Sequence, residues 1–154
     1  EQFKWTARES GIDNMLGKSN YTLVTDRNAL GVDMDDSNSN DDKIVREVHL
    51  VVDKPVLLKF RAKDVIHSAF LPHFRVQMNC VPGLSTQFAF TPTKTTAEMK
   101  DQEGDDFEYV LLCNKICGAA HYNMQMSFIV ETQQEYDTWI ASQKVLSEKL
   151  LTQK

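Results

Sequence analysis

The sequence predicts an all-β fold, a β-sandwich or barrel, followed by one C-terminal α-helix. Three observations predict it. Short runs of β-branched and aromatic residues alternate between apolar and polar positions, turn signals separate these runs, and apolar residues recur at helical spacing only near the end of the chain. The 154 residues are expected to form a single domain, residues 1–154, and they are enough to bury a sizeable core.

The first third of the chain is the least regular part. Residues 1–9 are aromatic and mixed, which fits a strand with Phe3 and Trp5 on one side. Residues 10–43 are rich in Gly, Asn, Asp and Ser and are expected to form an irregular acidic insertion. Its tail, residues 33–42, is either a solvated loop or part of a docking surface for a cationic partner.

Strands are expected from residue 44 onward. Val48, Leu50 and Val52 alternate with Glu47 and His49, so this first strand is half buried, with His49 exposed. Further strands are expected over residues 56–62, 87–90, 107–112 and 126–131. The sequence Val-Pro-Gly at 81–83 favours a type II turn, and the acidic residues 101–106 favour a turn or loop.

The C-terminal segment, residues 132–151, is the one region expected to be helical. Thr132 and Glu135 have the spacing of a capping box. The apolar side chains that follow at helical spacing predict a packing face: Tyr136, Trp139, Ile140, Leu146 and Leu150.

The composition excludes several functional classes. Hydrophobic residues make up 42% of the chain and charged residues 25%, which argues against global disorder. The net charge of −5 disfavours nucleic acid and suits a basic protein partner. No apolar run approaches the roughly 20 residues that a membrane span needs, and no signal peptide opens the chain, whose first residues read as the middle of a longer protein.

One loop between the last two expected strands carries four side chains that bind metals. Residues 113–124 fit the pattern C-x3-C-x3-H-x2-M, with Cys113, Cys117, His121 and Met124 as candidate ligands. Thiolate, imidazole and thioether together select copper among the common metals. One Cys, one His and one Met on a loop, with a distant His, is the blue-copper arrangement, and the second cysteine would let two thiolates bridge two copper ions.

The distant histidine is expected to be His67. It follows residues 64–66 at the end of a strand, where the scaffold can hold it rigidly, whereas His73 follows Pro72 in a turn-like stretch and is expected at the surface. Two further sulfur-containing residues are expected in the core. They are Cys80, which lies outside the loop, and Met126, which alternates with apolar neighbours.

Two other interpretations of the loop remain open at this point. Cys113, Cys117 and His121 could hold a structural zinc ion together with His67, but zinc gives no role to Met124. A disulfide between Cys113 and Cys117 could form in an oxidising compartment, and it would destroy the metal site.

Taken together, these motifs resemble the extramembrane copper-A domain of subunit II of haem-copper cytochrome c oxidases, from residue 2 to about residue 139. Residues 64–68 resemble the family's first-ligand motif, 81–83 the turn that follows it, 113–124 the metal loop, and 136–139 the closing helix. The resemblance implies a cupredoxin-like Greek-key β-barrel or sandwich with a C-terminal α-helix.

A binuclear copper-A centre is implied by the same resemblance. The sulfurs of Cys113 and Cys117 would bridge the two copper ions. The other ligands would be His67, His121, the weak axial Met124 and the backbone carbonyl of Lys115.

Two positions depart from the family's pattern. The family usually has a glutamate that ligates magnesium where this chain has Lys115, so no magnesium ligand is expected from this position. The family opens with Gln-Trp-x-Trp, whose first tryptophan is implicated in receiving electrons, whereas this chain has Phe3 at that place. Trp5 or Tyr122 could substitute for it in electron uptake.

The implied function is electron transfer within an oxidoreductase complex. Cytochrome c or an equivalent basic donor would deliver single electrons, and subunit I would use them at its haem to reduce oxygen, which this chain alone would not do. The acidic residues 33–42 and 101–108 would contribute to docking of the donor. The segment would be the soluble domain of a membrane-anchored subunit, on the periplasmic face of a bacterial inner membrane.

Three alternatives remain open. The first is a copper-A domain of nitrous oxide reductase, although residues 67–68 and the 81–83 turn favour the oxidase. The second is a copper chaperone or storage module, but such sites release metal and tend to have few ligands. The third is a zinc-stabilised interaction module.

Overall fold

A computed structural model gives the fold and describes residues 4–11 and 13–146. The chain forms two compact units. The first contains residues 46–138 together with the N-terminal residues up to Trp5, and the second contains residues 6–45 and the C-terminal residues from Trp139. That the two units make one domain stays a prediction. No helix within the described ranges is long and apolar enough to cross a membrane.

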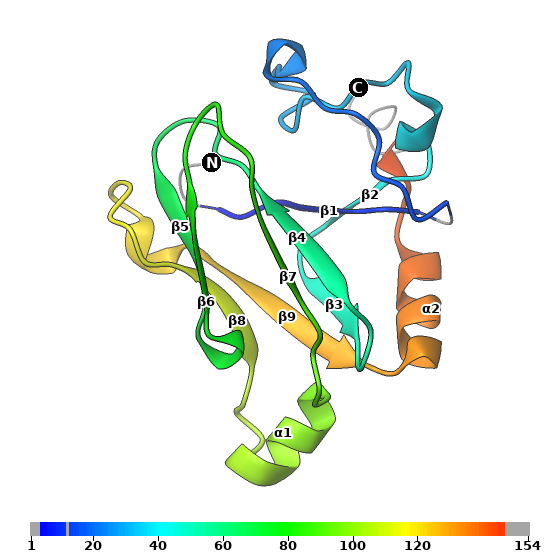
Figure 1. The fold of residues 1–154 in the computed structure, drawn as a ribbon, viewed down its shortest axis with the longest axis vertical. Coiled ribbons are helices and arrows are strands. Elements are labelled where there is room, and N and C mark those ends of the chain that lie inside the picture. The colour runs from blue at the N-terminus through cyan, green and yellow to red at the C-terminus, as the bar shows by residue number, and fades with distance from the viewer. Residues whose placement is uncertain (1–3, 12, 147–154) are drawn as a thin grey trace. The chain divides into compact units, whose positions relative to one another are not determined.

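A five-stranded sheet forms the centre of the first unit (Figure 1). Its strands, in spatial order, are β3 (Val48–Val51), β9 (Gln125–Glu131), β8 (Tyr109–Cys113), β5 (His67–Leu71) and β6 (Val76–Cys80). Neighbours are antiparallel except β3 and β9, which are parallel. Alternate residues of β8 and β9 are buried, so one face of these strands faces the core, as the period of two predicts.

A two-stranded ribbon completes the core of this unit. It consists of β4 (Val56–Phe60) and β7 (Thr86–Phe90), which pair in antiparallel register. Phe74, from the 3-10 turn after β5, stacks on Tyr109 of β8 with ring centroids 4.6 Å apart and lies 4.7 Å from the ring of Phe90 on β7. This aromatic contact joins the ribbon to the sheet, and such pairs add about 0.5–1.5 kcal/mol to the effect of burial alone.

The expected β fold is confirmed, with corrections to single elements. The expected strand from residue 44 to 52 is divided into β2 (Lys43–Val45) and β3. Neither β5 nor β6 was expected, and His67 begins β5 rather than following the end of an earlier strand. His49 on β3 is only 7% exposed, so the prediction that it is exposed is wrong. Its burial is tolerated because its Nδ1 lies 2.6 Å from a carboxylate oxygen of Glu131 and its Nε2 lies 3.3 Å from one of Glu47.

Helix α1 (Thr96–Glu103) is a second correction, because residues 101–103 were expected in a turn or loop. Thr95 and Glu98 form a capping box at its start, with both reciprocal hydrogen bonds present. None of its residues is buried, so the helix lacks the apolar stripe by which a helix is usually recognised in a sequence. The Thr-x-x-Glu spacing was the available signal.

Helix α2 (Gln133–Ser142) begins where the capping box of Thr132 and Glu135 predicts, but it is shorter than the expected 132–151. The ammonium group of Lys43 donates hydrogen bonds to the carbonyl oxygens of Ile140 and Gln143, at 2.6 and 2.9 Å, which satisfies carbonyl groups at the helix end. Val145 then forms a β-bridge with Lys43. Residues 147–151 of the expected helix lie outside the described residues.

The second unit pairs β1 (Ala7–Glu9) with β2 and contains two 3-10 turns, Tyr21–Leu23 and Ser37–Ser39. Its acidic tail is neither wholly solvated nor wholly available for docking, because Asp42 is fully buried. Asp42 Oδ2 lies 3.0 Å from Arg8 Nη1 and accepts a hydrogen bond from the Gly17 N–H. Burial raises the pKa of Asp42, against the opposing effect of Arg8. Asp42 therefore has a structural role.

Candidate metal centre

Strand register explains how ligand candidates far apart in sequence become neighbours. His67, the first residue of β5, pairs with Cys80, the last of β6, while Ala69 pairs with Cys113, the last of β8. The start of β5 and the ends of β6 and β8 therefore lie at the same edge of the sheet. The loop after β8 leaves from this edge, where the Asn114 N–H donates a 3.3 Å hydrogen bond to the Ser68 carbonyl.

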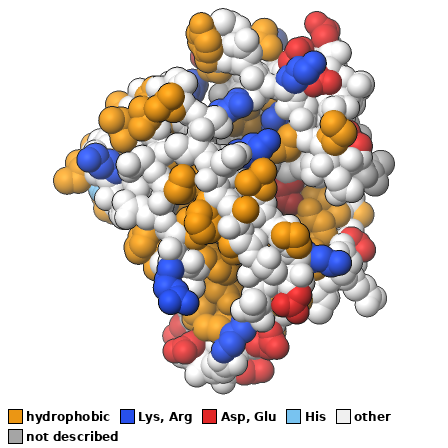
Figure 2. All heavy atoms as spheres, viewed as in Figure 1, with side chains coloured by type: hydrophobic (Ala, Val, Ile, Leu, Met, Phe, Trp, Pro, Cys, Tyr) orange, Lys and Arg blue, Asp and Glu red, His pale blue; other side chains and the backbone are white. Residues whose placement is uncertain are grey.

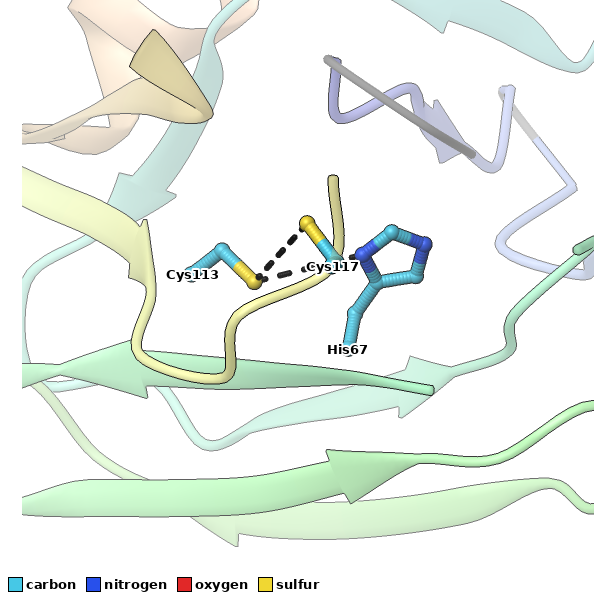
Figure 3. A group of neighbouring side chains, drawn as sticks. All are labelled: His67, Cys113 and Cys117. Atoms are coloured by element: carbon cyan, nitrogen blue, oxygen red, sulfur yellow. Dashed lines mark hydrogen bonds between the residues drawn. The ribbon is translucent and has the colours of Figure 1, made fainter. Parts of the chain in front are cut away.

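Three buried side chains meet at this edge (Figure 3). One ligand atom from each of His67, Cys113 and Cys117 lies within 4.8 Å of those of the other two. Cys113 Sγ is 3.9 Å from Cys117 Sγ and 3.9 Å from His67 Nδ1. His67 is 1% exposed and each cysteine 8%, so the cluster is shielded from water.

The loop after β8 adds three further donor groups to this cluster. Cys117 Sγ lies 3.6 Å from His121 Nδ1 and 3.8 Å from Met124 Sδ. The carbonyl oxygen of Lys115 lies 3.3 Å from Cys113 Sγ. All six predicted ligands are thus brought together, while their role as ligands stays a prediction.

Backbone hydrogen bonds hold the loop in this shape. The Cys113 N–H donates to the Met124 carbonyl at 3.1 Å, so the two ends of the loop are joined. A 3-10 turn over His121–Asn123 follows, in which the Met124 N–H donates to the His121 carbonyl at 3.2 Å. The turn directs the His121 and Met124 side chains to the same sulfur, that of Cys117.

Two outer contacts position the donors. Asp64 Oδ1 lies 2.9 Å from His67 Nε2, which favours a proton on Nε2 and leaves Nδ1, the nitrogen facing the sulfurs, free to bind a metal. Trp5 packs against the cluster, and its indole N–H donates to the Met124 carbonyl at 3.3 Å. The sequence reasoning missed the role of Asp64, which the three-residue spacing to His67 could have indicated.

The remaining residues considered from the sequence are placed as follows. Tyr122 is 87% exposed, and Phe3 lies outside the described residues. Cys80 is fully buried, Met126 is in the core and His73 is exposed, as predicted. The 81–83 turn is confirmed, because the Leu84 N–H donates to the Val81 carbonyl and Gly83 has a φ of 82°, a conformation that favours glycine.

The donor set fits a soft metal ion rather than a disulfide. The three cysteines are free, and the 3.9 Å between the two loop sulfurs is far from the roughly 2.05 Å of a disulfide bond. Metal–thiolate bonds are about 2.3 Å long, so two sulfurs 3.9 Å apart can share one ion. Burial, with a smaller effect of the Cys113 thiol, raises the pKa of Cys117, so a bound cation would be needed to favour its thiolate.

Comparison with known proteins gives consistent results. The family described as "Cytochrome C oxidase subunit II, periplasmic domain" matches residues 18–133. The chain is 34% identical over 149 residues to the alternative cytochrome c oxidase subunit 2 of Bradyrhizobium diazoefficiens, covering 96% of this chain and 50% of that protein. It is 31% identical over 96 residues to cytochrome c oxidase subunit 2 of Synechocystis sp., covering 62% and 26%.

The chain thus spans about half the length, or less, of these relatives. Among solved structures, the periplasmic domain of subunit II of the Bradyrhizobium japonicum cytochrome oxidase is similar, with a TM-score of 0.54 and 24% identity. The match covers 64% of each chain. At this identity the likeness shows a shared fold, and it confirms the predicted cupredoxin-like architecture.

Proposed function

This chain belongs to the family of the periplasmic domain of cytochrome c oxidase subunit II, and on that premise we propose that it is the binuclear copper-A electron-transfer domain of a haem-copper respiratory oxidase. One observation carries the proposal. Two thiols, two imidazole nitrogens, a thioether and a carbonyl oxygen converge in a buried cluster, joined by contacts of 3.3 to 3.9 Å. Soft donors of this kind favour copper over zinc, and Met124, 1% exposed, is a donor that a zinc site would not use.

The residues of the chain have distinct tasks in this proposal. When bound, two copper ions would supply a carrier that takes up and releases one electron at a time. Cys113 and Cys117 would hold both ions, while His67 and His121 would hold one each. The sheet edge and the closed loop fix these donors, so that little atomic movement accompanies a change of charge.

Membership of the family supports the partners that we propose for this chain. Cytochrome c or an equivalent one-electron donor delivers electrons to this domain, which passes them to haem in subunit I, where oxygen is reduced. In this proposal the chain supplies electrons, and oxygen is reduced in subunit I. Segments outside this chain anchor the domain at the periplasmic face of the inner membrane.

The contacts of Lys115 support a carbonyl ligand and no magnesium ligand at this position. The carbonyl oxygen of Lys115 faces the cluster, although the residue as a whole is exposed. The ammonium group of its side chain would repel a divalent cation. We therefore expect the side chain of Lys115 to bind no magnesium ion.

Trp5 is the favoured residue for electron uptake. Its ring centroid lies 6.3 Å from that of His67, and its N–H is bonded to the Met124 carbonyl, so it contacts two candidate ligands. We expect Trp5→Leu to slow electron uptake by the copper-loaded chain roughly 10- to 100-fold, the range for lost outer contacts of a metal site. Stopped-flow reduction measures the rate.

Tyr122→Leu is the matched control, because Tyr122 adjoins His121 but is almost fully exposed. It should leave the rate nearly unchanged if Trp5 is the relay. A larger loss of rate for Tyr122→Leu than for Trp5→Leu would instead assign the role to Tyr122. Copper content and the optical spectrum of both variants exclude loss of the metal as the cause.

Burial of the cluster also favours electron transfer over the alternatives. A chaperone must release its metal, whereas His67, Cys113, Cys117 and Met124 are all at least nine-tenths buried and would hold an ion away from solvent. The family match favours the oxidase over nitrous oxide reductase.

The proposal is tested by loading the chain with copper under anaerobic conditions and recording its electron paramagnetic resonance spectrum. Total copper and zinc per chain are measured on the same sample. We expect two copper ions per chain with one unpaired electron split by both nuclei. One copper ion per chain, with hyperfine splitting by a single copper nucleus, would favour the copper chaperone over the electron-transfer domain. Zinc alone, bound in preference to copper, would place the structural interaction module first.

A further inference from the structure

Trp5 contacts the candidate metal centre from a segment that is far away in the sequence. Its indole N–H donates a 3.3 Å hydrogen bond to the carbonyl of Met124, which lies 119 positions later in the chain. Its ring packs against Cys113, Cys117 and Met124, and the ring centroid lies 6.3 Å from that of His67. Trp5 therefore adjoins donors from both sources, the start of β5 and the loop after β8.

The carbonyl of Met124 is the point at which the metal loop closes. It accepts the Cys113 N–H at 3.1 Å as well as the indole N–H of Trp5. A carbonyl oxygen has two lone pairs, so it can accept both hydrogen bonds at once. The bond from Trp5 thus reinforces the junction between Cys113 and Met124, the first and the last donor of the loop.

Between its buried donors the metal loop is exposed, at residues 114–116 and 118–119. In Figure 2, orange and blue side chains lie at the left edge, where the loop after β8 lies in Figure 1, so the loop forms part of the surface of the first unit. The Asn114 N–H ties the start of the loop to the sheet through the Ser68 carbonyl, at 3.3 Å. At the end of the loop, the indole of Trp5 supplies the corresponding tie.

We propose that Trp5 is a positioning residue that clamps the metal loop closed and thereby determines how slowly the site releases its metal. The inference rests on the proposed function and adds to it the residue that controls retention of the ion. Met124 can move away from an ion only if the junction at its carbonyl opens, and Trp5 holds that junction. Trp5 is partly buried and packs on three donors that are at least nine-tenths buried, so it also shields them from solvent.

The place of Trp5 in the chain suits a clamp that opens and closes. Trp5 lies outside the helices and strands, two residues before β1 begins. Its position depends on side-chain contacts, so its bond to Met124 can open locally while the strands stay paired. The metal can then be held tightly without making the whole sheet an obstacle to its entry.

Trp5→Phe separates the hydrogen bond from the aromatic ring. Phenylalanine keeps a ring against the donors but has no N–H for the Met124 carbonyl. We expect the copper-loaded variant to release copper to an excess of chelator roughly tenfold faster than the unmodified chain, the lower end of the range for lost outer contacts of a metal site. An unchanged rate of release would refute the clamp.

Trp139→Phe is the matched control. Trp139 is the other tryptophan of the chain and belongs to the second unit, so the same N–H is removed at another place. The control should release copper at the rate of the unmodified chain. Equal acceleration in both variants would assign the effect to a general loss of stability and overturn the proposal.

The reduction potential reports on the position of Met124, which a general structural role of Trp5 would not change. An axial thioether donates electron density to the oxidised ion, so a less firmly placed Met124 sulfur should raise the reduction potential. We expect this rise in Trp5→Phe and no change in Trp139→Phe. A potential unchanged in both variants would contradict the positioning of Met124 by Trp5.

Amide hydrogen exchange tests the clamp in the metal-free chain. The Cys113 amide shares its acceptor with Trp5, so we expect it to exchange at least about threefold faster in Trp5→Phe. The Val52 amide, bonded to the Glu131 carbonyl at the other end of β9, should be unchanged. Equal acceleration of the two amides, or of neither, would refute a local clamp.

The unmodified chain provides a test that does not depend on the folding of a variant. We expect the indole N–H of Trp5 to exchange more slowly than that of free tryptophan, and more slowly still after copper loading, because a bound ion would hold Met124 in place. Exchange at the rate of free tryptophan in both states would overturn the proposal.

These measurements also separate failure of this inference from failure of the proposed function. Hydrogen exchange in the metal-free chain reports on Trp5 whether or not a binuclear centre forms. Conversely, a binuclear centre that loses copper equally fast from Trp5→Phe and from the unmodified chain would keep the proposed function and reject the clamp.

Discussion

Replacing Cys117 with serine is expected to abolish the binuclear centre and to leave at most one weakly held copper ion. Cys117 Sγ is the shared neighbour of the cluster, 3.9 Å from Cys113 Sγ, 3.6 Å from His121 Nδ1 and 3.8 Å from Met124 Sδ. A serine oxygen is a hard donor that remains protonated at neutral pH, so the bridge between the ions is lost. Since even outer contacts change metal affinity about 10- to 100-fold, removal of this ligand should cost at least ~100-fold.

Copper per chain, the paramagnetic resonance spectrum and the rate of electron uptake measure this effect. Cys80→Ser is the matched control. Cys80 is a buried thiol on β6 that pairs with His67 in the sheet, yet it lies outside the cluster, and a serine there can still donate to the Met78 carbonyl. We expect the control to retain two copper ions. Two ions with an unchanged spectrum in Cys117→Ser would disprove the bridging role.

Copper uptake by the chain is expected to weaken steeply as pH falls. Both loop thiols must lose a proton on binding, and the raised pKa of Cys117 keeps its thiol protonated at neutral pH. Each displaced proton makes the apparent affinity fall tenfold per pH unit, so two protons give about 100-fold.

In the metal-free chain, the raised pKa of Cys117 makes folding stability fall as pH rises, whereas copper binding strengthens as pH rises. Because the folded state favours the protonated Cys117 thiol, its contribution to stability is fully present below the ordinary value of 9.0 and is lost as pH rises through the folded value. The metal-free fold should therefore weaken at alkaline pH while copper binding strengthens. Copper affinity is measured by competition titration with a chelator, and the number of displaced protons by proton release in weakly buffered solution. Urea unfolding measures the stability of the metal-free fold. Uptake independent of pH from 6 to 8 would contradict the displacement of thiol protons.

Local patterns in the sequence were sufficient for most of the fold. The strands β4, β7, β8 and β9 and the start of α2 follow from alternation, β-branched residues and a capping box, all of which act between residues close in the chain. Most of the candidate ligands were likewise predictable, because five of the six lie on one loop and four of these have side-chain donors that suit copper. The carbonyl of Lys115 was expected only from the family resemblance. The choice of His67 among four histidines needed the motif of residues 64–68 as well.

Other features depend on contacts between distant residues, which alternation does not encode. His49 has the pattern of an exposed residue but is buried against Glu131, 82 positions away in the sequence. Asp42 belongs to an acidic run but is buried beside Arg8. At the end of helix α2, the carbonyl oxygens of Ile140 and Gln143 accept hydrogen bonds from Lys43, about 100 positions earlier in the chain.

The sequence by itself determined the β architecture, the donor set and the metal that this set prefers, because these depend on residue types and short spacings. Only the tertiary structure decided how the donors meet and which charges surround them. The register of β5 with β6 and β8 places His67 beside Cys113, and the fold places a carboxylate oxygen of Asp64 2.9 Å from His67 Nε2. Such placement depends on strand pairing between distant segments, which composition and short spacings do not encode.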